Sequence, residues 1–110
     1  MRRVMVRYRV HPGRVAENEA LVRAVYDELA RIDPAGFRYA TFRLDDGVTF
    51  VHIASTDAAD GSTPLPGLAA FQRFQEGIAQ RCEERPVVTE LAEVGSFHFF
   101  GPFDGRDGAA

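Results

Sequence analysis

The sequence contains no lysine and no tryptophan, and it has one cysteine among its 110 residues. Because lysine is absent, no Schiff base can form with a carbonyl substrate, which excludes pyridoxal-dependent enzymes and lysine aldolases. Cys82 is the single cysteine, so an intrachain disulfide and a metal site built from several cysteines are excluded as well. These absences narrow the possible chemistry before any motif is considered.

Long apolar runs are also missing, since no segment approaches the roughly 18 residues of a membrane span. The basic N-terminus has arginine at Arg2, Arg3, Arg7 and Arg9, which interrupts the apolar stretch that a signal peptide needs. We therefore expect a cytoplasmic protein with no membrane partner. The net charge of -3 disfavours a nucleic-acid partner, because such proteins need positive charge to neutralise phosphates.

What is present is typical of one globular domain, with 45% hydrophobic and 26% charged residues. A chain of 110 residues has room for a single core. We predict one domain over residues 1–100 and a flexible tail over 101–110.

Local patterns predict the elements in the order strand, helix, strand, strand, helix, strand. Apolar residues alternate with arginine in the first segment, recur at helical spacing in the second, and are aromatic or β-branched in the next two. Asp46-Gly47 is a hairpin signal between these two strands. The predicted elements are a strand over 3–10, a helix over 14–32, strands over 37–44 and 48–54, a loop over 55–67, a helix over 68–82, and a strand over 87–100 with a bulge at Gly95.

This order predicts an α+β, ferredoxin-like β-α-β-β-α-β fold, with a four-stranded antiparallel sheet ordered 4-1-3-2 and two helices on one face. The large apolar side chains of the strands are too many for the helix-covered face alone. A second sheet packed against the first would bury them, so we expect a homodimer. The residues that carry this expectation are Phe50, Phe42 or Tyr39, Phe97 and Phe99.

Three groups of residues form a recognisable pattern over roughly residues 3–96. They are Arg9-Val10-His11-Pro12-Gly13-Arg14 leading into Glu17, Leu21 and Arg23; Gly36-Phe37-Arg38-Tyr39 with Phe42-Arg43 and Asp45-Asp46, followed by Phe50-Val51-His52-Ile53; and Val87-Val88 to Val94-Gly95. This pattern resembles the antibiotic biosynthesis monooxygenase family. The resemblance implies a dimeric α+β barrel, in a family that includes cofactor-independent oxygenases of quinols and polyketides.

The sequence departs from that family in two places. Ala54 stands where many members have a tryptophan, and the helix predicted over 68–82 lacks the histidine that binds haem in the haem-degrading branch. The resemblance therefore implies a monooxygenase-like protein that acts on a small aromatic or quinone-like molecule without a cofactor. A non-catalytic dimeric protein that binds such a molecule is the alternative.

Four residues are candidates for the site. His52 lies within a predicted strand, where its imidazole could accept a proton from a phenolic or hydroquinone substrate. Asn18 falls on the apolar stripe of the helix over 14–32, which suggests a polar pocket under that helix. Tyr39 and Arg43 share one strand face and could hold an oxygen-bearing ligand.

Each candidate also has a structural interpretation. His52 could be a core or interface histidine bonded to a neighbour, and Asn18 a first-turn residue within reach of water. Tyr39 and Arg43 could make dimer contacts. A metal site is not expected, because the predicted sheet places His11 and His98 at opposite ends.

Two further chemistries have little support in the sequence. Cys82 is predicted near the C-terminus of a helix, where the dipole raises the pKa of a thiol and disfavours a nucleophile. The segment Gly47–Val51 is similar to part of an RNA-recognition strand, but Val48 and Ile53 replace its stacking aromatic residues.

Overall fold

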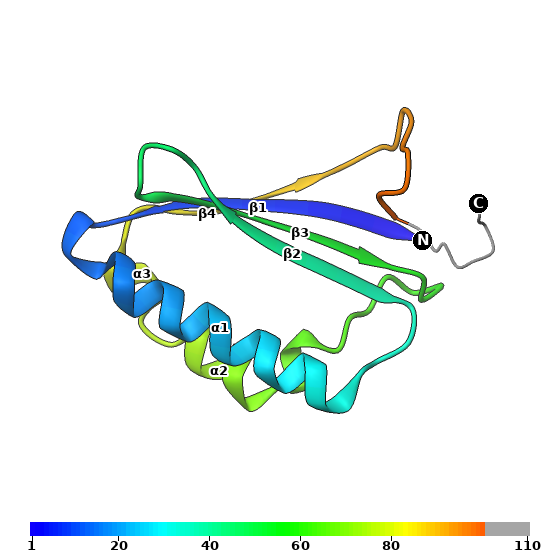
Figure 1. Cartoon of the computed structure of the whole chain (residues 1–110), viewed down its shortest axis with the longest axis horizontal. Helices are drawn as coiled ribbons and strands as arrows, with labels where there is room; N and C mark the ends of the chain where they lie inside the picture. The colour runs from blue at the N-terminus through cyan, green and yellow to red at the C-terminus, as the bar shows by residue number, and fades with distance from the viewer. Residues whose placement is uncertain (101–110) are drawn as a thin grey trace.

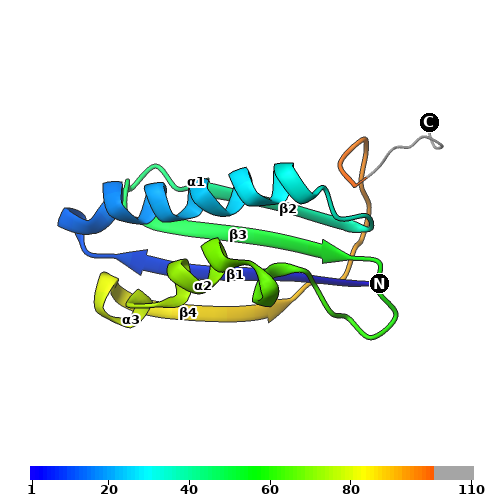
Figure 2. The same cartoon turned by 90° about the horizontal axis from the view of Figure 1, so that it is seen from below.

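The computed structural model describes residues 1–100, so the tail predicted over 101–110 lies outside the described residues. The chain forms one antiparallel sheet in the order β2-β3-β1-β4, with the helices on one face (Figures 1 and 2). This is the ferredoxin-like α+β fold predicted from the sequence, and the predicted strand order is confirmed. None of the helices within residues 1–100 is both long and apolar enough to cross a membrane.

The strands are β1 (Arg2–Val10), β2 (Phe37–Arg43), β3 (Thr49–Thr56) and β4 (Cys82–Glu90). The helices are α1 (Val15–Ile32), α2 (Ala69–Gln75) and α3 (Ile78–Arg81). Two short 3-10 helices, Pro12–Arg14 and Leu65–Gly67, precede α1 and α2.

The central strands β1 and β3 alternate between a helix-covered face and an opposite face. Tyr8 is buried beneath the helices, whereas Arg7 is exposed on the other side. The register sets Tyr8 opposite Phe50 and Val6 opposite His52, and β2 sets Thr41 beside His52 from the other edge. Pairing alone therefore gathers hydroxyl and imidazole side chains on the helix-covered face.

Helix α1 is amphipathic, as its sequence predicts. Val22, Val25 and Asn18 are buried against the rest of the fold, while Arg23 and Asp27 are exposed. The helix ends at Ile32; the next residue, Asp33, has a left-handed backbone (φ 48°) that turns the chain away, and its N–H donates to the Leu29 carbonyl.

The hairpin between β2 and β3 is confirmed. The Asp46 carboxylate accepts hydrogen bonds from the backbone N–H groups of Val48 (3.0 Å) and Thr49 (2.9 Å). Gly47 takes the positive φ of 80° that the turn requires. Asp46 therefore closes the turn and fixes the register of β3.

The prediction of a single helix over 68–82 is wrong. The chain instead forms α2 and α3, separated by extended backbone at Glu76 and by Gly77 in a left-handed conformation (φ 71°). Cys82 is the first residue of β4 and not the end of a helix, and burial is the main reason that the pKa of its thiol is raised. A left-handed glycine cannot continue a helix, which explains the break.

The boundaries predicted for the last strand are also wrong. Its charged start, Glu83 to Pro86, belongs to β4, and β4 ends at Glu90, before Gly95. The irregular pairing lies elsewhere, between Arg7 and Val10 of β1 opposite β4. Because β4 is an edge strand, charged residues and proline are tolerated there.

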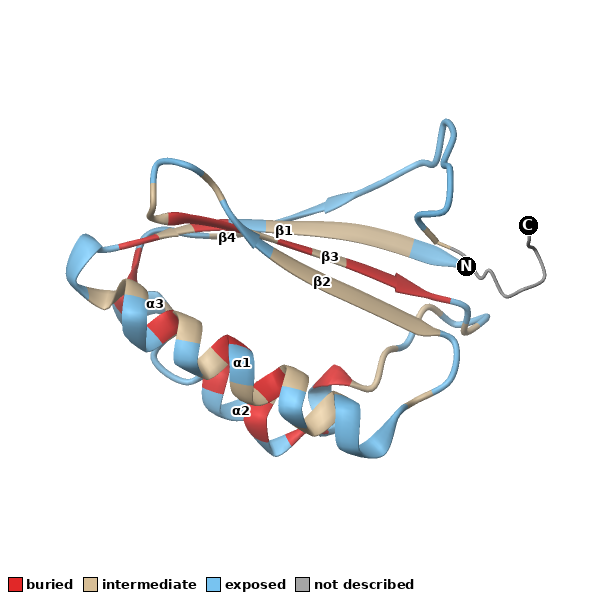
Figure 3. Cartoon of the chain, in the orientation of Figure 1, coloured by how far each residue is buried: buried red, intermediate tan, exposed pale blue. Residues whose placement is uncertain are grey.

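The sheet face away from the helices carries exposed apolar side chains. Phe42 is 49% exposed and Val87 is 62% exposed, and the register places Val51 and Arg7 between them. Phe50, also considered for this face, is buried under the helices instead. Figure 3 shows most of β4 exposed after the buried Cys82, in contrast to the buried parts of β1 and β3.

Candidate functional site

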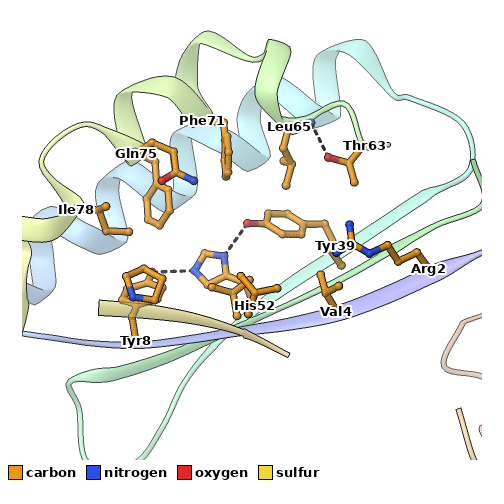
Figure 4. Close-up of a pocket in the computed structure, with 15 residues that line it drawn as sticks. Arg2, Val4, Tyr8, Tyr39, His52, Thr63, Leu65, Phe71, Gln75 and Ile78 are labelled. Carbon is orange, nitrogen blue, oxygen red and sulfur yellow. Dashed lines mark hydrogen bonds between the residues drawn. The ribbon is translucent and has the colours of Figure 1, made fainter. Parts of the chain in front are cut away.

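A cavity of about 490 Å³ lies between the sheet and α2 (Figure 4). Its size is in the range of pockets that bind small organic molecules. Its lining residues come from all four strands, from α2 and α3, and from the loop before α2. They are Arg2, Val4, Val6, Tyr8, Tyr39, His52, Ala54, Thr63, Leu65, Phe71, Phe74, Gln75, Ile78, Pro86 and Val88.

This cavity corrects the position predicted from the sequence, because none of its lining residues belongs to α1. Helix α1 buries Val22 and Val25, and the two pockets that its residues line beside β2 are smaller, at about 240 and 290 Å³. The shorter α2 and the small side chain of Ala54 leave the open volume. The cavity therefore lies beside α2, which is shorter than α1.

His52 lies in the cavity wall with 4% of its surface exposed and with both ring nitrogens engaged. Its Nε2 is 2.8 Å from the Tyr8 hydroxyl, and its Nδ1 is 2.7 Å from the Tyr39 hydroxyl and 3.2 Å from Thr41 Oγ1. Burial lowers the pKa of His52 to about 4. The imidazole is therefore neutral at pH 7.

Both tyrosines beside His52 are protonated at neutral pH. Burial raises the pKa of the Tyr8 and Tyr39 hydroxyls well above the ordinary value for tyrosine. Each hydroxyl therefore keeps its proton and can donate one hydrogen bond.

A buried hydrogen-bond chain continues behind Tyr8. The Tyr8 hydroxyl accepts from Asn18 Nδ2 (2.9 Å), and Asn18 Oδ1 accepts from Nε of Arg81 (3.2 Å). The guanidinium of Arg81, 1% exposed, also donates to the carbonyls of Phe74 (2.7 Å) and Glu76 (3.0 Å). The chain as a whole consists of Arg81, Asn18, Tyr8, His52 and Tyr39.

The structure brings three of the four predicted site residues into this chain. His52 and Tyr39 line the cavity, while Asn18 is fully buried behind Tyr8 and does not line it. Arg43 lies apart, where it donates to the Glu19 carboxylate at 2.8 Å beside a separate shallow groove. The catalytic or binding roles of all four residues stay predictions.

Sequence reasoning missed Tyr8 and Arg81 as site residues. Tyr8 carried a usable signal, because a buried tyrosine hydroxyl on the inner face of a strand needs a hydrogen-bond partner. Arg81 carried none, since its position depends on the break at Gly77. Among residues 1–100, no group of three or more histidine, cysteine, aspartate or glutamate side chains is arranged to hold a metal ion.

The fold and the cavity together define a ferredoxin-like α+β protein with room for a small molecule between its sheet and its helices. No protein-family profile and no curated protein sequence matches the chain. Solved structures do match it over most of their length.

Three of these structures illustrate the likeness. A crystal structure of an antibiotic biosynthesis monooxygenase matches with a TM-score of 0.71 and 18% identity, covering 86% of this chain and 100% of the other. Rv0793 from Mycobacterium tuberculosis matches with a TM-score of 0.68 and 18% identity, covering 86% and 96%. A mutant of SnoaB, a cofactor-independent oxygenase from Streptomyces nogalater, matches with a TM-score of 0.64 and 20% identity, covering 86% and 94%. The chain therefore has the fold of the antibiotic biosynthesis monooxygenases.

Proposed function

We propose that the protein is a cofactor-independent, monooxygenase-like enzyme that binds a small aromatic or quinone-like molecule in the cavity between α2 and the sheet. The observation that carries this proposal is the Tyr39–His52 pair in the wall of an otherwise largely apolar cavity. The fold shared with SnoaB supports the same activity class.

The cavity offers one kind of surface to the aromatic rings of such a molecule and another to its oxygen atom. Phe71 and Phe74, whose ring centroids are 5.9 Å apart, provide apolar contacts for an aromatic body. Tyr39 provides a hydroxyl that can face an oxygen of the ligand. Aromatic burial then supplies affinity, and the hydroxyl supplies orientation.

Stabilisation of an oxygen anion is the chemical step that these residues suit best. A ketone with an acidic CH₂ group, such as anthrone, loses a proton to give an enolate whose charge lies mainly on oxygen. A hydrogen bond from the Tyr39 hydroxyl to this oxygen favours the anion. His52 is a weak base because of its low pKa, so we propose that the substrate proton leaves to water while His52 holds Tyr39 in place.

The remaining steps need only molecular oxygen. The enolate carbon gives an electron pair to O₂ and forms a C–O bond, and the resulting peroxide anion takes up a proton. Loss of water from this hydroperoxide leaves a ketone, so one oxygen atom stays in the product and the other leaves as water. The substrate supplies the electrons, and no organic cofactor takes part.

Oxygen uptake with anthrone tests this proposal. We expect the wild-type protein to consume oxygen above the uncatalysed rate, and His52→Ala to fall to that rate because Tyr39 loses its partner. His11→Ala is the matched control, since His11 is exposed and lies outside the cavity. Equal uptake by His52→Ala and the wild type would refute a catalytic role for His52.

A non-catalytic binding protein is the second candidate. It is favoured by the engagement of both ring nitrogens of His52, which leaves neither nitrogen free to take a substrate proton. This alternative predicts that anthraquinone raises the melting temperature of the protein, while no oxygen is consumed with anthrone. Oxygen uptake that depends on His52 would exclude it.

We also propose that two copies of the chain associate through the sheet face away from the helices. Exposed Phe42 and Val87 on this face favour burial against a second sheet. The family that the sequence motifs resemble forms dimeric barrels.

A further inference from the structure

We propose that Arg81 sets the direction of the buried hydrogen-bond chain, so that the Tyr39 hydroxyl donates into the cavity and selects ligands with an acceptor oxygen. The inference rests on the proposed function in one respect, because it takes the same cavity as the ligand site. It adds the chemical class of the ligand group, a carbonyl or enolate oxygen, and a positioning residue outside the cavity lining.

The direction begins at Arg81 because a guanidinium has only donors. Its Nε lies 3.2 Å from the side chain of Asn18, so the Asn18 atom that faces it must be the acceptor oxygen. The Asn18 amide nitrogen then faces Tyr8 and donates to its hydroxyl oxygen at 2.9 Å. A flipped amide would set two donors against each other at Arg81.

The donors and acceptors at Tyr8 can be assigned in the same way. Its hydroxyl oxygen already accepts from Asn18, and its single proton needs an acceptor. Among residues 1–100, that acceptor is Nε2 of His52 at 2.8 Å. Nε2 is therefore unprotonated, and the neutral imidazole carries its proton on Nδ1.

The last bond of the chain reaches the cavity. Nδ1–H of His52 donates to the Tyr39 hydroxyl oxygen at 2.7 Å, closer than Thr41 Oγ1 at 3.2 Å. Within residues 1–100, the Tyr39 hydroxyl has no hydrogen-bond partner other than His52, and Tyr39 lines the cavity. Figure 4 shows the Tyr39 and His52 side chains together between the sheet and α2. The free Tyr39 proton is thus left for a ligand oxygen.

Arg81 is fixed in this arrangement by the helix that covers the cavity. Its other guanidinium nitrogens donate to the carbonyls of Phe74 and Glu76 at the end of α2, where helix carbonyls lack partners. Phe74 itself lines the cavity. Arg81 therefore links the position of α2 to the proton on His52.

The tautomer of His52 tests the inference directly by ¹⁵N NMR of the imidazole nitrogens at neutral pH. In the wild type we expect a protonated Nδ1 and an unprotonated Nε2. Asn18→Asp is predicted to invert this pattern, because a carboxylate only accepts and Tyr8 would donate to it, which leaves Tyr8 to accept from Nε2–H. A wild-type His52 protonated on Nε2, or the same tautomer in both proteins, would overturn the inference.

Ligand preference gives a second readout that does not need the Asn18 variant. Fluorenone and fluorene share a planar ring system, and only fluorenone has a carbonyl oxygen. We expect Tyr39→Phe to weaken fluorenone binding roughly 2- to 10-fold, as for the loss of one neutral hydrogen bond, and to leave fluorene binding unchanged. An equal effect on both ligands would contradict a donating Tyr39.

Neither readout depends on turnover, so the two proposals can fail separately. Absence of oxygen uptake would remove the proposed enzymatic function and leave the tautomer and the ketone preference intact. A His52 protonated on Nε2 would remove the present inference, even if oxygen were consumed.

Discussion

At the scale of single residues, the site depends on one buried, neutral histidine held between two tyrosine hydroxyls. An isolated imidazole would exchange protons freely near neutral pH, but burial keeps His52 uncharged down to about pH 4. The same burial keeps the hydroxyls of Tyr8 and Tyr39 protonated. These three side chains therefore interact through directed hydrogen bonds and not through charge.

This environment makes the stability of the protein depend on pH. In the unfolded chain His52 protonates near its ordinary pKa of 6.5, whereas in the fold it stays neutral until about 4. Protons stabilise the unfolded state in this interval, so the free energy of unfolding falls as pH drops from about 6.5 to about 4. The expected loss from His52 is roughly 3 kcal/mol, and urea unfolding at several pH values measures it.

His52→Gln provides the control for this measurement, because glutamine donates and accepts hydrogen bonds without titrating. Both proteins are compared at one concentration, since self-association changes apparent stability. The difference between wild type and variant isolates His52 from the carboxylates. Parallel pH dependences in the two proteins would show that His52 does not titrate as described.

The residues of the site were predictable only in part. Strand alternation placed His52 within a strand and put Tyr39 and Arg43 on one face, but it did not decide which face the helices cover. Asn18 was correctly placed on the apolar stripe of its helix, but its partners are distant in sequence. Arg43 shares a strand face with Tyr39 yet lies beyond the cavity, because alternation gives the face and not the distance along it.

At the scale of elements, the break between α2 and α3 controls the cavity. Gly77, with a φ of 71°, turns the chain so that Arg81 reaches back to the carbonyls of Phe74 and Glu76. A continuous helix would carry Arg81 away from these groups. One glycine therefore positions both the cover of the cavity and the start of the buried hydrogen-bond chain.

Replacing this glycine tests its role. We expect Gly77→Ala to lower the free energy of unfolding by about 1–2 kcal/mol, because a left-handed backbone is costly for residues with a Cβ. Among residues 1–100, a Cβ at this position meets only Gln80 and Arg81 side-chain atoms, at 3.8 and 3.9 Å, so the cost comes from the backbone and not from a clash. Chemical denaturation measures the change.

Gly67→Ala is the matched control at the other end of α2. A Cβ on Gly67 would have no atom of the described part of the chain within 4 Å, and the φ of Gly67 is not in the left-handed range. Its stability is expected to stay within about 0.5 kcal/mol of the wild type. A similar loss of unfolding free energy in both variants would contradict a special role for the left-handed backbone of Gly77.

The elements themselves were predicted well where the sequence pattern is regular. The alternation in β1, the stripe of α1 and the Asp46-Gly47 turn each gave the observed structure. The boundaries of β4 were wrong because Glu83, Glu84 and Pro86 are typical of the end of a helix. An edge strand that exposes one side has no need of an apolar pattern, so its sequence carries little signal.

At the scale of the whole molecule, the two faces of the sheet differ in what covers them. The helix-covered face holds the cavity and the buried hydrogen-bond chain. The opposite face presents Phe42 and Val87 to solvent in the single chain. The proposed dimer would bury the outer face. The cavity between the sheet and α2, on the other face, would stay open to a ligand.

Sedimentation velocity of charged variants tests the dimer. We expect the wild type to sediment as a dimer, and Phe42→Asp to weaken association roughly tenfold or more, because an unpaired carboxylate would be buried in the interface. Ile32→Asp is the control, since Ile32 on α1 has the same 49% exposure as Phe42 but lies on the helix side. A monomeric wild type, or equal dissociation by both variants, would contradict the proposed interface.

The central claim is that the cavity under α2 binds an aromatic molecule through an oxygen that faces Tyr39, and a crystal structure of the protein with anthraquinone tests it most directly. The account predicts the ring system beside Phe71 and Phe74, with a carbonyl oxygen at hydrogen-bond distance, roughly 2.7–3.0 Å, from the Tyr39 hydroxyl. Anthraquinone bound beside Arg43 or on the outer face of the sheet, with the cavity under α2 empty, would contradict it.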